Sequence, residues 1–325
     1  MEFDRDAVTG KCAELAKTGI YIGTSSWKYE GWLGQMYHPE AYDYRGKFAR
    51  TRFERTCLSE YGRVFKTVCV DGAYYNFPST HYLEGLAEQV PYDFKFGFKV
   101  TDAITIKKFP RLPRFGERAG KWNEHFLNAD LFASAFLRPC EAIRDKVGIV
   151  IFEFSRFWAS DYQHGKDFIA DLDSFLGDLP KGWPYGVEIR NATWLKPEYF
   201  DVLRTHNITH VFNSWEAMPS VREQFVLEGS VTTHQRVAAR FLLKPGTKYE
   251  GAVKAFSPYD KTKEIYQDGR DIASWILQQC LEEKRGAYIY VNNRFEGNAP
   301  NTIDAILRPF RLPIPPAESL RCPGL

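Results

Sequence analysis

Eight short apolar runs, separated mostly by helix-like stretches, predict a single-domain α/β protein built as a (β/α)8 TIM-type barrel with parallel strands. The length of 325 residues is somewhat above the usual size of such a barrel. No Gly-x-Gly-x-x-Gly turn follows the first apolar run and no phosphate-binding loop occurs, which weakens the alternative of an open, doubly wound sheet. We expect long, aromatic-rich loops at the C-terminal face of the barrel.

The expected strands are short runs rich in β-branched and aromatic residues. They span residues 20–26, 67–72, 94–100, 148–154, 184–190, 209–214, 237–242 and 287–293. The expected helices cover residues 4–18, 45–61, 79–89, a long stretch ending near 146, then 166–176, 197–206, 271–284 and 302–308. We therefore divide the chain into a helical N-terminal extension (1–19), a barrel domain (20–308) and a proline-rich tail (309–325).

The strand expected at residues 184–190 has one apolar and one polar face, because side chains alternate along a strand. The apolar face carries Tyr185, Val187 and Ile189, and the opposite face carries Gly186, Glu188 and Arg190. Unpaired charge is costly to bury, so we expect Glu188 and Arg190 to point into a polar site at the end of the strand. The alternative is an internal Glu–Arg pair that only fixes the strand.

The same alternation recurs in the other strands and places polar side chains towards their C-terminal ends, where barrel enzymes hold their sites. The expected acids are Asp71, Glu153 and Glu188, with catalytic roles, and the expected bases are Lys99, Arg190 and Arg240. Neutral hydrogen-bonding residues are Ser25, Asn213, Asn292 and Asn293, and stacking walls are Trp27, Trp32, Tyr74, Tyr75, Trp194 and Trp215. Each group has an alternative explanation, since charges can neutralise one another in a structural network and aromatic residues commonly pack in cores.

Composition narrows the function classes. The net charge of +2 gives no global electrostatic case for nucleic-acid or membrane binding. The six cysteines lack metal-like spacing, which favours reduced thiols in a cytoplasmic protein. No signal peptide or membrane segment is expected. We expect no cofactor and no dedicated metal site, although carboxylates alone leave a divalent-ion site open. Cys69 lacks a visible histidine partner and is interpreted as a small core residue.

Five motifs, taken in order, resemble the YecE-like family, the domain of unknown function numbered 72. They are Gly23-Thr24-Ser25-x-Trp27, Val68-x-Val70-Asp71-x-x-Tyr74-Tyr75, Phe96-x-Phe98-Lys99, Val187-Glu188-x-Arg190-x-x-x-Trp194, and Asn292-Asn293 followed by Gly297-x-Ala299-Pro300-x-Thr302. The resemblance implies a TIM-type barrel with a site at its mouth, but it names no reaction. Departures from the family pattern occur at Cys69, Ile106, Glu153, Leu242 and Leu243.

Two functions fit these residues, and the sequence leaves open whether the protein is an enzyme. The first is metal-independent hydrolysis of a small anionic or polyhydroxylated ligand, such as a sugar, sugar phosphate or nucleotide, held by arginines. The second is ligand or single-stranded nucleic-acid binding without catalysis, with Lys107, Lys108, Arg111 and Arg114 contacting phosphates. Such a basic run is more often a solvated face. The oligomeric state is not predicted.

Overall fold

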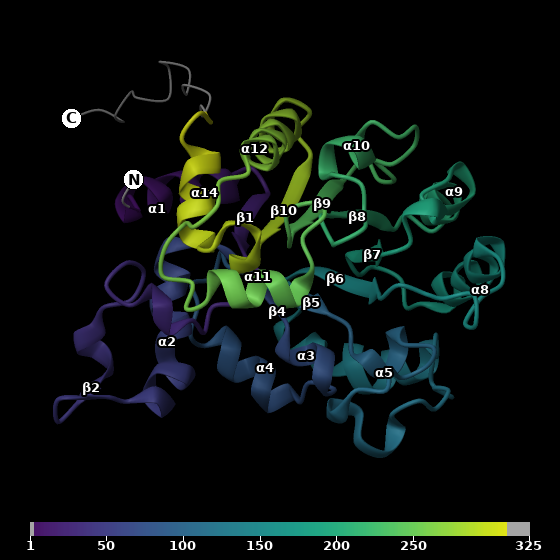
Figure 1. The fold of residues 1–325 in the computed structure, drawn as a ribbon, viewed down its shortest axis with the longest axis horizontal. Helices are drawn as coiled ribbons and strands as arrows, with labels where there is room; N and C mark the ends of the chain where they lie inside the picture. Colours follow the sequence, from purple (N-terminus) through teal and green to yellow (C-terminus); the bar gives the residue numbers. More distant parts are fainter. Residues whose placement is uncertain (1–2, 311–325) are drawn as a thin grey trace, which may run out of the picture.

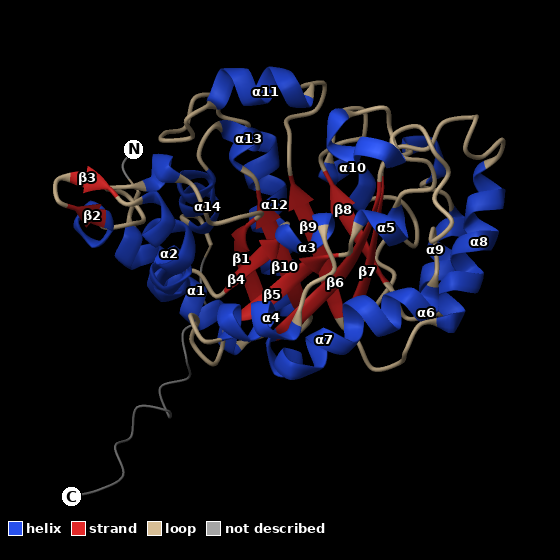
Figure 2. Ribbon diagram, turned by 90° about the horizontal axis from the view of Figure 1, so that it is seen from below, coloured by secondary structure: helices blue, strands red, loops and turns tan. Residues whose placement is uncertain are grey.

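The computed structural model describes residues 3–310, and its centre is a closed barrel of eight parallel strands (Figures 1 and 2). The strands are β1 (Ile20–Thr24), β4 (Thr67–Val70), β5 (Lys95–Lys99), β6 (Val147–Phe154), β7 (Tyr185–Ile189), β8 (Thr209–Asn213), β9 (Arg236–Phe241) and β10 (Gly286–Val291). Neighbouring strands pair in the order β1-β10-β9-β8-β7-β6-β5-β4, and β1 pairs with β4 to close the barrel. All eight predicted strands are present, and the single-domain (β/α)8 fold is confirmed.

Helices surround the barrel, and short helices also occur in the connections between its strands. The α-helices are α1 (Arg5–Lys17), α2 (Arg50–Val64), α3 (Gly72–Tyr75), α4 (Thr80–Ala87), α5 (Asp102–Thr105), α6 (Ala129–Leu131), α7 (Arg138–Cys140), α8 (Gly165–Asp178), α9 (Pro197–Thr205), α10 (Val221–Phe225), α11 (Tyr249–Phe256), α12 (Gln267–Glu282), α13 (Asn293–Glu296) and α14 (Ala299–Leu307). None of the helices within residues 3–310 is long and apolar enough to span a membrane. The expected proline-rich tail lies outside the described residues beyond Phe310.

Two expected helices differ most from the observed ones, and several short observed helices were not expected. The helix predicted from residue 45 begins at Arg50, because a small hairpin of β2 (Asp43–Tyr44) and β3 (Lys47–Phe48) precedes it. The long helix predicted up to residue 146 is broken into short α, π and 3-10 pieces between Ala129 and Lys146. Pro139 lies inside this stretch and lacks the N–H that a continuous helix needs. The short helices α10 and α11 carry too few residues to show a clear helical period in the sequence.

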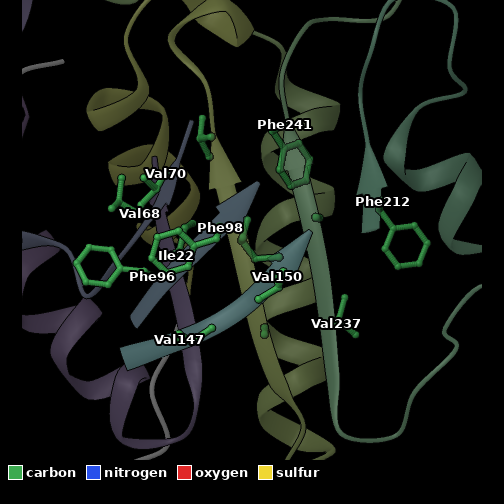
Figure 3. Close-up of a cluster of buried hydrophobic side chains, with 14 of the residues drawn as sticks. Ile22, Val68, Val70, Phe96, Phe98, Val147, Val150, Phe212, Val237 and Phe241 are labelled. Carbon is green, nitrogen blue, oxygen red and sulfur yellow. The ribbon is translucent and has the colours of Figure 1, made fainter. Parts of the chain in front are cut away.

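The alternating residues of the strands form two separate cores, as the predicted faces required. Outward-facing residues such as Val68, Phe96 and Val150 pack under the helices (Figure 3). Inside the barrel, a small apolar layer is formed by Cys69, Ile149, Ile151, Val211, Ala238 and Tyr290. Burial raises the pKa of the Cys69 thiol to about 12, consistent with its interpretation as a core residue. This layer closes the middle of the barrel, so the polar residues above it sit in a mouth with a floor.

Helix α1 packs against the barrel. It contacts β1, α2 and α14, and it buries Val8, Cys12 and Leu15. The Nζ of Lys11 also donates a hydrogen bond of 2.6 Å to the carbonyl oxygen of Leu307 near the end of α14. The first and last long helices therefore lie side by side and tie the two ends of the described chain together (Figure 1).

At Gly23, β1 lies close to the residue that begins β4. A Cβ atom on Gly23 would lie 2.1 Å from the carbonyl oxygen of Thr67. We expect Gly23→Ala to lower the free energy of unfolding by at least about 1–3 kcal/mol, because the backbone that closes the barrel must move. Gly10→Ala is the matched control: Gly10 lies inside α1 with open space around it, so alanine there should raise stability by about 0.5–1 kcal/mol. Urea denaturation of both variants measures this difference, and equal effects would contradict the close-approach explanation.

Candidate functional site

A cavity of about 470 Å³ opens at the C-terminal ends of the strands. Nine residues singled out in the sequence line it: Asp71, Tyr74, Tyr75, Lys99, Glu153, Arg190, Trp215, Arg240 and Asn292. Lys99, Glu153 and Arg240 lie in β5, β6 and β9. The other six follow the C-terminal ends of β4, β7, β8 and β10. Helix α11 lies across this end of the barrel and contacts α13, as Figure 2 shows. The polar side chains that alternation predicts at the strand ends therefore line one cavity.

Glu153 is the centre of a buried ion network in the floor of this cavity. Its Oε2 atom lies 2.6 Å from Nη1 of Arg240, 2.9 Å from Nη2 of Arg190 and 3.0 Å from Nζ of Lys99. Burial alone would raise the pKa of the Glu153 carboxyl, but Arg190, Lys99 and Arg240 hold it well below its usual range. Glu153 is therefore a permanent anion at neutral pH and has no proton to give as a general acid.

Glu188 is the second anion of the network and is completely buried. Its Oε2 accepts a hydrogen bond of 2.7 Å from Nη1 of Arg240, and its Oε1 accepts one of 3.3 Å from Nε of Arg190. Burial alone would lower the pKa of Arg240, whereas Glu188 and Glu153 raise it well above its usual range. The two glutamates therefore fix the orientation of both guanidinium groups, which agrees with the structural alternative considered for the Glu–Arg strand.

Asp71 differs from the two glutamates in its access to the cavity. It directly follows β4, and its side chain is 35% exposed. Its Oδ1 atom is buried, has no hydrogen-bond partner among residues 3–310 and lies 3.9 Å from Nη2 of Arg240. Of the three predicted acids, Asp71 is therefore the one with space beside it for a ligand.

Aromatic rings cover the cations of the network. Nζ of Lys99 lies 3.7 Å from the ring centroid of Tyr74, and the guanidinium carbon of Arg190 lies 3.8 Å from that of Trp215. At these distances the cations are attracted to the ring faces. Tyr75 is 53% exposed at the rim, so its ring is available to a ligand.

Besides the fully buried Glu188, six predicted site residues do not line the cavity. Trp32 is fully buried and packs against Tyr29 and Tyr37, and Trp194 stacks on Phe157 and Phe168. Trp27 is likewise part of the hydrophobic core. These three tryptophans pack against other side chains, which agrees with the alternative that aromatic residues commonly pack in cores.

The three polar residues of this group have structural partners or lie behind the cavity. Asn213 donates a hydrogen bond of 3.0 Å to the carbonyl oxygen of Ile189, and Asn293 accepts one of 2.8 Å from the N–H of Ala299. Ser25 lies in a small void shared with Asn292 and Asn293, and its buried Oγ has no hydrogen-bond partner in the described structure.

Eight lining residues were not assigned to the mouth from the sequence, among them Arg114, Tyr249 and Arg294. Arg114 belongs to the basic run considered as a phosphate-contacting loop or a solvated face, and its guanidinium lies 5.8 Å from the ring centroid of Tyr75. Tyr249 begins α11, and the guanidinium of Arg294 lies 4.7 Å from its ring centroid. Residues outside the strands show no alternation of apolar and polar side chains. The one sequence feature that could have placed any of these three at the mouth is the position of Arg294, two residues after Asn292.

Between residues 3 and 310, no group of three or more His, Cys, Asp or Glu side chains is placed to hold a metal ion. His210, on the outer face of β8, is fully buried, and burial lowers its pKa to about 3. Its imidazole is therefore neutral and packed away from the mouth.

The ion network makes a prediction about stability and pH. Glu153→Gln should lower the free energy of unfolding at pH 7 by about 3–5 kcal/mol, because three buried cations lose their shared counter-ion. The pKa of Glu153 is lower in the folded protein than in the unfolded chain, so its stabilisation is complete above about pH 4.3 and is lost as the pH falls further. Urea denaturation between pH 7 and pH 3 should show a steeper loss for the wild type than for Glu153→Gln.

The matched control is Glu14→Gln, which removes an exposed carboxylate 2.6 Å from Lys17 on α1. It should change stability little at either pH, because exposed ion pairs contribute little. Wild-type stability of Glu153→Gln at pH 7 would show that the network does not depend on this carboxylate.

Comparisons with known proteins agree with the barrel. A family model described as "Protein of unknown function DUF72" matches residues 21–318. The crystal structure of a DUF72 family protein from Enterococcus faecalis V583 superimposes with a TM-score of 0.62 at 17% identity, covering 91% of this chain and 97% of that one. That of a DUF72 family protein from Thermotoga maritima MSB8 gives a TM-score of 0.55 at 19% identity, covering 88% and 96%. No curated protein matches the sequence.

At such identities the structural likeness shows the fold alone. The family model, however, spans most of the chain, including all eight barrel strands but for the first residue of β1. The resemblance drawn from the five sequence motifs is therefore confirmed, and the protein belongs to the DUF72, or YecE-like, family.

Proposed function

We propose that the barrel mouth binds a small ligand carrying a phosphate or another oxyanion on a sugar or nucleotide. The observation that carries this proposal is the pair of rim arginines, Arg114 and Arg294. Both line the cavity, and neither has a carboxylate partner within the part of the chain that the structure describes. Guanidinium groups suit phosphate and carboxylate geometry, and ligand oxygens would supply the missing counter-charge.

The charge distribution in the cavity supports the same conclusion. In the floor, the three cations Lys99, Arg190 and Arg240 are balanced by Asp71, Glu153 and Glu188. At the rim, Arg114 and Arg294 face a single further acid, Glu250. The surplus positive charge therefore lies where a ligand enters, and the floor presents oriented but neutralised groups.

Aromatic surface at the rim favours a ligand with a flat or polyhydroxylated part. Tyr75 and Tyr249 are exposed by 53% and 40%, and the ring of Trp215 lies over Arg190. Sugars and bases stack on such rings. A ligand with an anionic group between the arginines and a ring on the tyrosines would use both features.

If the ligand is hydrolysed, we assign the acid–base step to Asp71. Its carboxylate reaches the cavity, whereas both glutamates are saturated by cations. In this proposal Glu153 and Glu188 are positioning residues that hold Arg190 and Arg240 towards the ligand. General acid–base catalysis requires a group within hydrogen-bond reach of the reacting atom, and Asp71 meets that condition best.

The proposal is tested by a thermal-shift screen with sugar phosphates, nucleotides, their dephosphorylated forms and divalent metals. A phosphorylated ligand at a hundred times its Kd should stabilise the wild type by about 2.7 kcal/mol, which is several degrees in Tm. Arg114→Gln and Arg294→Gln should abolish most of this shift without lowering the Tm of the free protein. Lys47→Gln, on the distant β2–β3 hairpin, is the charge-matched control and should respond like the wild type.

Asp71→Asn separates binding from turnover in the same screen. It should retain the ligand-induced shift and lose any hydrolysis of that ligand. Equal shifts for the wild type and both rim variants would contradict the proposed site, and turnover by Asp71→Asn would contradict the proposed acid–base residue.

A second candidate function is single-stranded nucleic-acid binding, and a groove beside the mouth favours it. This groove has a volume of about 240 Å³ and shares Pro110 and Ser155 with the mouth. Trp158 on its edge is 60% exposed and carries the guanidinium of Arg156 at 4.5 Å. Exposed aromatic rings and a basic track are the features that hold successive bases and phosphates.

The groove gives a distinct prediction for a single-stranded oligonucleotide. Binding measured by fluorescence anisotropy should weaken steeply with salt, because each neutralised phosphate releases a counter-ion. Trp158→Ala should weaken it by about 1–3 kcal/mol if a base stacks there. Tyr92→Ala removes another highly exposed ring, outside the groove, and should have no effect. Tight oligonucleotide binding that Trp158→Ala leaves intact would argue against the groove.

A further inference from the structure

A second cavity lies at the opposite end of the barrel, where the strands begin. It has a volume of about 510 Å³ and is slightly larger than the mouth. Its basic residues are Lys95, Lys181, His206 and Arg236, and none of the Asp and Glu residues between 3 and 310 lines it. Lys95 begins β5 and Arg236 begins β9, so the strand starts bring these charges together.

Arg236 is the unusual residue of this cavity. Its side chain is partly buried, yet it makes no hydrogen bond or ion pair with any residue between 3 and 310. Burial lowers the pKa of Arg236, and no carboxylate opposes the effect. Arg240, four residues later on the same strand, is held by two glutamates, and Arg270 is held by Glu296 at 2.7 Å. Of the two inward arginines of β9, Arg240 has counter-ions and Arg236 has none among residues 3–310.

The neighbouring cations are held in place by uncharged or external groups. Nζ of Lys95 donates to the carbonyl oxygen of Asp145, and Nζ of Lys181 donates to that of Gly177 at 3.1 Å. His206 contacts Asp173 at 2.6 Å, but Asp173 does not line the cavity. Carbonyl oxygens leave the positive charge of both lysines in place, so the cavity as a whole is positive.

The base of the cavity is aromatic and rigid. Tyr288 lines it and stacks on Tyr21 with ring centroids 5.2 Å apart and an angle of 4° between the planes. Trp183 forms another part of the wall and is itself covered by the guanidinium of Arg144 at 4.3 Å. A stiff apolar floor beneath unpaired positive charge lowers the local dielectric response and strengthens the attraction for an anion.

We propose that this cavity is a second anion-binding site that takes a phosphate or polyphosphate group through Arg236, Lys95 and Lys181. The bound oxyanion would supply the counter-charge that Arg236 lacks. The inference is independent of the proposed mouth ligand, since the two cavities share no residue. Because the N-terminal face of such barrels contributes stability rather than chemistry, the expected consequence of binding is stabilisation of the fold.

The test is isothermal titration of the full chain with inorganic pyrophosphate at low salt, using the wild type, Arg236→Gln and two controls. Arg236→Gln should weaken binding at this site at least ten-fold. Lys47→Gln removes one positive charge from the distant hairpin and should bind as the wild type does. Arg114→Gln changes the mouth alone and should leave the Arg236-dependent site intact, so the two sites are counted separately.

Thermal unfolding of the free proteins shows whether lost binding reflects misfolding. Arg236→Gln removes a partly buried, unpaired charge, so its Tm without anion should be no lower than that of the wild type. Pyrophosphate should then raise the Tm of Arg114→Gln, and the double variant Arg114→Gln/Arg236→Gln should lose that rise. Wild-type affinity in Arg236→Gln, equal weakening in Lys47→Gln, or no pyrophosphate binding by the wild type would each overturn the proposal.

Discussion

The buried contact of Glu153 and Glu188 with Lys99, Arg190 and Arg240 is the interaction on which the mouth of the barrel depends. Barrel interiors are normally filled by branched apolar side chains, and here the upper layer is ionic instead. Removing such charges from water is costly, and their mutual attraction offsets the cost only when geometry and hydrogen bonding are good. Oε2 of Glu153 meets three cations within 3.0 Å, so the layer exists only as a set.

This dependence explains the small residues beneath the ionic layer. Gly97 and Gly186 face the interior, where Cβ atoms would collide with the hydroxyl of Tyr290 or with Val211. Because both residues lack a Cβ atom, there is room for Tyr290, whose hydroxyl lies 3.3 Å from Oγ1 of Thr67 and which closes the middle of the barrel. The apolar layer in turn keeps water from the underside of the ion network. The two cavities are thereby separated.

Much of the fold could be predicted from the sequence, because a strand has a period of two and each inward residue is thereby identified. Alternation placed Glu188, Arg190 and Arg240 inside the barrel, but it cannot show which acid meets which base. It also says nothing about loops. Trp32 and Trp194 end short 3-10 helices and pack into aromatic clusters, whereas Arg114 reaches the rim from a run that resembled a solvated face. These positions depend on tertiary packing between distant segments, which local patterns do not encode.

The division of labour among the acids follows from access rather than from residue type. A carboxylate with several cationic partners is stable as an anion and changes its protonation state reluctantly. Glu153 and Glu188 are therefore suited to orient arginines, and Asp71, which has open space and a single cation at 3.9 Å, is suited to meet a ligand. The same reasoning applies in reverse at the other end of the barrel. There Arg236 has a positive charge but no acid within residues 3–310 to orient it, which is the feature that the proposed anion would complete.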